Sequence, residues 1–143
     1  MKKLLCNQQG SVLVEFALVF YLYMAVIFMF LIHGLWLYNS FQTDRAARQA
    51  AYYYGTTGNA AKAKNAAVNY LDKTQVATTV KDISVYWSGR NASARVRVDM
   101  QTFFPGIPKL LNPKASAWSD SITISKEAIS PGEHQHTNSG EYN

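Results

Sequence analysis

The apolar run at residues 12–38 constrains this chain more than any other feature of its sequence. Among Asp, Glu, Lys, Arg and His, the run contains only two residues, Glu15 near its start and His33 near its end. A helix of this length extends about 40 Å at ~1.5 Å per residue, and a bilayer core needs roughly 20 apolar residues. The run therefore predicts a membrane-spanning helix. A carboxylate inside such a helix requires a physical reason, because an unpaired charge in lipid is costly.

Composition limits what the rest of the chain can be. Of the 143 residues, 105 follow residue 38 (143 − 38), which is enough for one small domain. The formal net charge is +5, but the charged residues beyond residue 39 are spread out, so no nucleic-acid partner is expected. The single cysteine, Cys6, excludes an intramolecular disulfide and a metal site made of several cysteines.

Residues 1–10 form a short, basic and polar leader. A secretory signal is cleaved after its apolar stretch, whereas the small residue Gly10 lies before the apolar run. Cleavage at Gly10 would therefore leave the apolar helix on the mature protein. Lys2 and Lys3 favour a cytoplasmic amino terminus by the positive-inside rule.

The residues around this boundary resemble the processing site of type IV pilin-like proteins, in the order Gly10, Ser11, Glu15 and Phe16. Residues 37–39 and 46–51 extend the resemblance to TadE-like minor pseudopilins of the tight-adherence (Tad/Flp) type IVb pilus family. The resemblance implies a minor pilin or pseudopilin that a prepilin peptidase cuts between Gly10 and Ser11. Such a subunit contributes to pilus assembly and surface adherence.

The same resemblance implies a location and a set of partners. The protein would cross the bacterial inner membrane once, with its amino terminus in the cytoplasm and its C-terminal domain in the periplasm, and would join a surface pilus. Its partners would be the prepilin peptidase, other pilin and pseudopilin subunits, the Tad-type assembly machinery of the inner membrane, and the lipid bilayer.

The spacing of Ser11 and Glu15 offers a physical reason for the carboxylate. They are four residues apart, so both lie on one face of a helix. Cleavage would give Ser11 a new α-ammonium group, and two opposite charges in lipid cost much less as a pair than separately. The amine would belong either to the same chain or to a neighbouring subunit, and the resemblance implies the neighbour. Phe16 belongs to the same subunit-assembly site.

Aromatic residues follow at the far end of the run. Trp36, Tyr38 and Phe41 suit a belt at the membrane–water interface, and a packing role fits them equally well. Asp44 and Arg48 have the acid-before-base spacing of a favourable pair along a helix. We therefore expect the helix to continue out of the membrane without a break, over residues 11–54.

The remaining sequence predicts an α+β domain at residues 55–129. A stop and loop at residues 55–59 precede an alanine-rich helix at 60–73. Alternating apolar and polar residues then predict three antiparallel strands, around residues 83–87, 94–101 and 121–125, with a turn at 88–91. One face of this sheet would be polar, and the helix at 60–73 would cover the other face.

Two segments have neither pattern. Residues 104–114 contain three prolines and are expected to form a loop held by Leu110 and Leu111. Residues 130–143 have no apolar pattern and are expected to be a disordered tail.

No residue pattern indicates an enzyme, a cofactor or a metal site. His134 and His136 lie in the polar tail, and Arg90, Arg95 and Arg97 form a basic strand face that we interpret as solvated. Two alternatives remain open. One is an uncleaved bitopic inner-membrane protein whose outward-facing domain binds a ligand, and the other is an enzyme whose site the sequence does not reveal.

Overall fold

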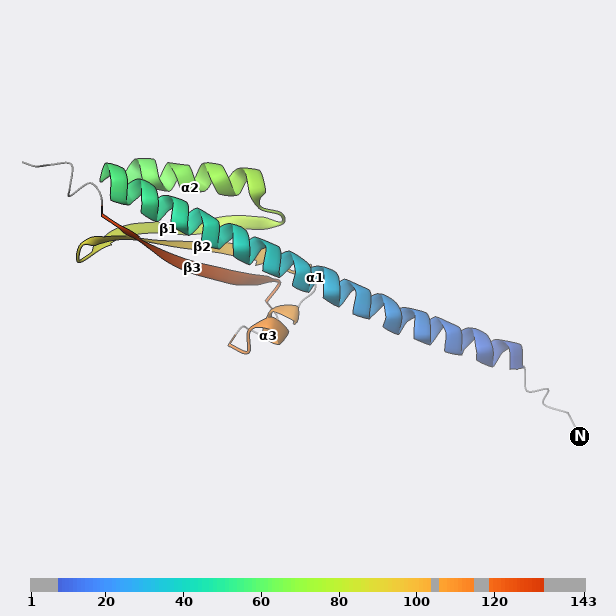
Figure 1. The fold of residues 1–143 in the computed structure, drawn as a ribbon. Coiled ribbons are helices and arrows are strands. Elements are labelled where there is room, and N and C mark those ends of the chain that lie inside the picture. The colour runs from blue at the N-terminus through green and yellow to red at the C-terminus, as the bar shows by residue number, and fades with distance from the viewer. Residues whose placement is uncertain (1–7, 104–105, 115–118, 133–143) are drawn as a thin grey trace, which may run out of the picture. The chain divides into compact units, whose positions relative to one another are not determined.

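The computed structural model describes residues 8–103, 106–114 and 119–132. Its elements in chain order are α1 (Gln8–Thr57), α2 (Ala60–Thr74), β1 (Thr78–Ser88), β2 (Asn91–Gln101), α3 (Ile107–Leu111) and β3 (Ser121–Pro131) (Figure 1). The predicted α+β class is confirmed, with one long N-terminal helix, one short helix and a three-stranded antiparallel sheet. The chain divides into two compact units after Gly34. The first unit contains the apolar part of α1, and the second, which we call the head, begins at Leu35.

The end of α1 lies three residues beyond the expected stop at Tyr54. The hydroxyl groups of Thr56 and Thr57 donate hydrogen bonds to the carbonyl oxygens of Tyr52 and Tyr53, one turn earlier, and so hold the last turn of the helix together. Gly58 then takes a positive φ of 63°, which favours glycine and ends the helix.

Helix α2 follows after two residues and agrees with the helix predicted at 60–73. The side chain of Asn59 caps its start by accepting a hydrogen bond of 3.1 Å from the amide of Lys62. The helix buries Ala63, Ala67 and Leu71, which are four residues apart and so lie on one face.

The sheet has the strand order β1-β2-β3, so β2 is the central strand. Val96, Val98 and Met100 of β2 are fully buried, whereas Arg97 between them is exposed, as the alternating pattern predicts. A two-residue turn joins β1 to β2, with Gly89 at a positive φ of 63°. A β-bulge at Lys81 shifts the register of β1 between Val80 and Asp82.

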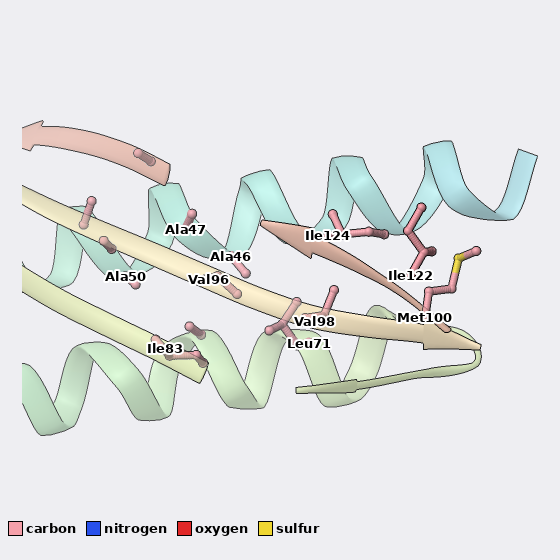
Figure 2. Packing of buried hydrophobic residues seen from close by; sticks show 14 residues of the cluster. Ala46, Ala47, Ala50, Leu71, Ile83, Val96, Val98, Met100, Ile122 and Ile124 are labelled. Atoms are coloured by element: carbon pink, nitrogen blue, oxygen red, sulfur yellow. The ribbon is translucent and has the colours of Figure 1, made fainter. Parts of the chain in front are cut away.

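Alanines of α1 contribute directly to the core of the head. Four of them have no exposed surface and pack with Leu71 of α2 and with the buried face of the sheet: Ala46, Ala47, Ala50 and Ala51 (Figure 2). Small side chains allow the helix and the sheet to approach closely. The sequence assigns the cover of the sheet to the helix at 60–73 alone, and the structure adds the second part of α1 to it.

Two further elements differ from the expectation. Residues 107–111 form the short helix α3 inside the predicted loop, with Pro108 in its first turn and buried. Strand β3 continues through Ser130 and Pro131, which the sequence assigns to the tail, because they pair with Ala92 and Asn91 of β2. The rest of the tail, residues 133–143, lies outside the described residues.

Candidate functional site

The first unit presents an apolar helical surface. The side chains of Val12, Leu13 and Phe16 are 64%, 72% and 70% exposed, and an 18-residue apolar window of α1 has no buried residue. Within the part of the chain that the structure describes, α1 is the one helix long and apolar enough to span a membrane. In water, such a surface would be left without apolar partners.

The acidic residue of this helix lies where the sequence places it. Gly10, Ser11 and Glu15 all belong to α1, and the exposed Glu15 follows Ser11 by about one turn. Across the described residues, the Glu15 carboxylate has no hydrogen bond and no ion pair. The ring of Phe16 stacks on that of Phe20, with centroids 6.3 Å apart, which directs it along the helix. The structure does not describe the side chain of Ser11.

The three aromatic residues expected at the interface have three different environments in the head. Trp36 is partly buried and packs against the apolar core. Tyr38 is 42% exposed, and its hydroxyl donates a hydrogen bond of 2.9 Å to the carbonyl of Thr74. Phe41 is 67% exposed. Trp36 and Tyr38 therefore make contacts within the head, as the alternative packing role predicts. Their place at a membrane interface stays a prediction.

Asn39 belongs to the stretch at residues 37–39 that carries the family resemblance, but the sequence assigned it no structural role. It has no exposed surface, and its amide donates a hydrogen bond of 2.9 Å to the carbonyl of Val76 and accepts one of 3.3 Å from the amide of Val76. The side chain thus satisfies both backbone groups of one residue in the connection between α2 and β1. Asn39 attaches this connection to α1, and Tyr38 attaches the last residue of α2 to it.

Two more polar contacts order the same stretch of α1. The hydroxyl of Tyr70 on α2 donates a hydrogen bond of 2.7 Å to Oε1 of Gln42. The predicted pair of Asp44 and Arg48 is confirmed, with Nε 2.9 Å from Oδ2. This pair is exposed, so it contributes on the order of 0–1 kcal/mol to stability.

Residues 10–51 match a family model described as TadE-like protein. This segment is TadE-like. The match supports the resemblance drawn from the sequence and suggests a pilin-like protein associated with a Tad pilus. No curated protein and no solved structure matches the chain.

The TadE-like segment covers more than the apolar surface. It includes Glu15, Asn39, whose side chain bonds to Val76 outside the segment, and the core alanines from Ala46 to Ala51. The family match therefore reaches from the apolar helix into the packing of the head and ends before the strands begin. No periodic pattern in the sequence indicates the contact of Asn39. The one signal for this residue is its place in the stretch that resembles the family.

The polar face of the sheet lies outside the TadE-like segment and is largely paired. Glu127 of β3 accepts hydrogen bonds from Tyr86 of β1 and, through Oε2, from Arg95 of β2, whose Nη2 lies 2.7 Å away. Hydrogen bonds from Tyr86 and Arg95 lower the pKa of Glu127 below its usual value. The positive charge of Arg95, which the sequence places on a solvated basic face, is thus partly neutralised by Glu127 of the same sheet.

A second ionic cluster lies farther along this face. Nζ of Lys81 is 3.1 Å from Oδ2 of Asp99, and Thr123 donates a hydrogen bond of 2.5 Å to the other carboxylate oxygen. Burial raises the pKa of Asp99, but the hydrogen bonds from Thr123 and Lys81 outweigh that effect and lower it. Within the described ranges, no three His, Cys, Asp or Glu side chains group to hold a metal ion. His134 and His136 lie outside those ranges.

Proposed function

We propose that this protein is a minor pilin or pseudopilin subunit that a prepilin peptidase cuts between Gly10 and Ser11. The observation that carries the proposal is an exposed apolar helix with one carboxylate a single turn after Ser11, inside the segment that matches the TadE-like family. The subunit contributes to the assembly of a Tad/Flp-type pilus and to surface adherence.

Local helix stability favours cleavage at this peptide bond. The bond between Gly10 and Ser11 lies near the start of α1, which begins at Gln8. The first four amide groups of a helix have no intrahelical acceptor, and glycine weakens a helix further. A protease that binds an extended chain can therefore open this turn at low energetic cost.

The Glu15 carboxylate then acts during assembly. Cleavage creates an α-ammonium on Ser11, and the carboxylate offers this amine a partner in an environment that penalises single charges. When the amine comes from a neighbouring subunit, the pair fixes the axial register between the two helices. The neighbouring pilin subunits, the assembly machinery of the inner membrane and the bilayer are then the partners of this helix.

Lys2 and Lys3 support the orientation of the subunit. Positive charge before the apolar helix favours a cytoplasmic amino terminus, so the head faces the periplasm before assembly. Trp36, Tyr38 and Phe41 then lie near the outer interface of the membrane.

Replacing Gly10 tests the processing step. Gly10→Val places a branched side chain at the scissile bond, and we expect the protein to keep residues 1–10. Gly10→Ala is the matched control, because a methyl group is a much smaller addition, and we expect it to be cleaved. Intact-mass and amino-terminal analysis of membrane fractions, with and without the peptidase, gives the result. Wild-type protein that begins at Met1 in both strains would favour the uncleaved bitopic protein.

Replacing Glu15 tests the assembly step separately. Glu15→Gln keeps the size of the side chain and removes its charge, so membrane insertion and cleavage should persist while incorporation into filaments falls. Asp72→Asn, an exposed change on α2 with the same loss of charge, should assemble as the wild type. Normal filaments from the Glu15→Gln variant would contradict the charge pairing and leave the cleavage proposal intact.

A further inference from the structure

A groove of about 670 Å³ lies between the second part of α1 and α2 in the head. Its α1 wall consists of Gln49, Tyr53 and Thr57, which recur every four residues and so follow one side of the helix. The helices lie side by side in Figure 1, and the hydrogen bond from Tyr70 to Gln42 joins them beyond Gln49. The volume falls within the usual range for ligand sites.

The α2 wall is a stripe of polar residues at helical spacing. Lys62, Asn65, Asn69 and Lys73 are three or four residues apart and share one face of α2. Lys62 and Lys73 are separated by about 16 Å along the helix, at ~1.5 Å per residue. The small side chain of Ala66 lies between them and leaves room in the middle of the groove.

The charge of the groove has one sign. Its lining contains two lysines and no aspartate or glutamate. Arg45 lies one turn before Gln49 on the same side of α1 and is exposed, so it adds a third positive charge nearby. Within the described residues, neither Lys62 nor Lys73 forms a salt bridge. The groove therefore favours an anionic ligand.

The neutral lining adds hydrogen-bonding capacity. The side-chain amides of Gln49, Asn65 and Asn69 have no hydrogen-bond partner among the described residues, and each can donate and accept. Both walls are helices, so no strand edge is available to an extended peptide. A ligand that supplies many hydroxyl groups together with carboxylates matches this lining better.

We propose that the groove between α1 and α2 binds a segment of an acidic polysaccharide. The carboxylates of its uronic-acid units lie against Lys62 and Lys73, and its hydroxyl groups exchange hydrogen bonds with Gln49, Asn65 and Asn69. This inference goes beyond the proposed function. It does not depend on cleavage at Gly10, because both walls of the groove lie in the head.

The binding test uses the full chain in detergent micelles, with hexagalacturonate as the probe and isothermal titration as the readout. Maltohexaose, a neutral sugar, should bind at least about tenfold more weakly, and so should hexaglutamate, an acidic peptide. Failure of hexagalacturonate to bind, or equal binding of the neutral sugar, would overturn the proposal. Tighter binding of hexaglutamate would assign the groove to acidic peptides instead.

Variants then locate the bound sugar. Lys62→Gln combined with Lys73→Gln should weaken binding by about tenfold or more, whereas Lys64→Gln combined with Lys114→Gln removes the same charge elsewhere and should change it little. Ala66→Leu fills the groove without altering charge and should also weaken binding, and Ala61→Leu on the same helix is its control. Equal losses in the paired lysine variants, or unchanged binding by Ala66→Leu, would indicate diffuse charge attraction and contradict the site. Thermal unfolding of every variant separates lost binding from lost folding.

Discussion

Asn39 shows how one buried amide can hold two distant parts of a chain together. It has no exposed surface and satisfies both the amide and the carbonyl of Val76, which is 37 residues away in sequence. If the side chain of Asn39 were removed, the amide and the carbonyl of Val76 would both lose their hydrogen-bond partner. The energetic penalty for such unpaired groups exceeds the net value of an ordinary exposed hydrogen bond.

We expect Asn39→Ala to lower the free energy of unfolding of the head by about 1–3 kcal/mol. Near-ultraviolet circular dichroism during thermal unfolding of the full chain in micelles measures this change. Asn65→Ala, at an exposed position of α2, is the control and should change stability by less than about 0.5 kcal/mol. Equal effects of the two substitutions would argue against the role of Asn39.

Glu127 makes stability depend on pH in a defined direction. Its pKa in the folded head is lowered by the hydrogen bonds from Tyr86 and Arg95, so its contribution is fully present above the pKa of the unfolded chain. The contribution is lost as pH falls through the lower, folded pKa. Asp99 acts in the same direction through Thr123 and Lys81.

We therefore expect the melting temperature of the wild type to fall more steeply than that of Glu127→Gln between about pH 6 and about pH 3. Thermal unfolding across this pH range, at constant ionic strength, checks the difference. Arg95→Gln should reduce the same slope, because it removes one of the groups that favour the ionised carboxylate. Parallel curves for wild type and Glu127→Gln would show that the Glu127 contacts do not contribute.

The elements were predictable from sequence where a regular pattern continues, and they were missed where it changes. The alternation at Ile83, Val85 and Trp87 predicted the second part of β1. The first part was missed because the bulge at Lys81 moves the inward positions from Thr78 and Val80 to odd-numbered residues. Periodicity also predicted α2 and its buried face, which need only local information.

Features that depend on distant contacts gave no such pattern. Strand β3 continues past Lys126 and Glu127, and those charged residues hide the pairing of its last residues with β2. The Asn39 contact, the partner of Arg95 and the groove each combine residues from separate elements. The processing site was predicted from residues adjacent in sequence, and its cleavage stays a prediction.

The end of α1 tolerates little added volume. A Cβ atom at Gly55 would lie 2.7 Å from the carbonyl oxygen of Pro131, at the end of β3. We expect Gly55→Ala to destabilise the head by about 1–3 kcal/mol, since the obstructing atom belongs to the backbone. Gly34→Ala has open space around the added methyl and should leave unfolding of the head unchanged or slightly improved. Thermal unfolding compares the two variants, and similar midpoints would contradict the tight contact.

At the scale of the whole molecule, the head begins at Leu35, well before α1 ends at Thr57. The core takes four alanines from α1, and all of them precede residue 55, at which the predicted α+β domain begins. A fragment from residue 55 would lack them and would expose the apolar face of the sheet.

We expect a fragment that begins at Leu35 to unfold cooperatively in water and a fragment that begins at Gly55 to bind apolar dyes and aggregate. Circular dichroism melts, dye fluorescence and size-exclusion chromatography distinguish them. Cooperative unfolding of the shorter fragment at a similar temperature would show that the α1 alanines are dispensable.

The use of α1 alanines in the core also sets an order of events during synthesis. Ala51 leaves the ribosome 77 residues before Ala128 of β3, with which it shares the core (128 − 51). At about 5–20 residues per second, that interval is roughly 4–15 seconds. During this time the alanine face of the newly made helix lacks the last strand of the sheet that covers it in the folded head.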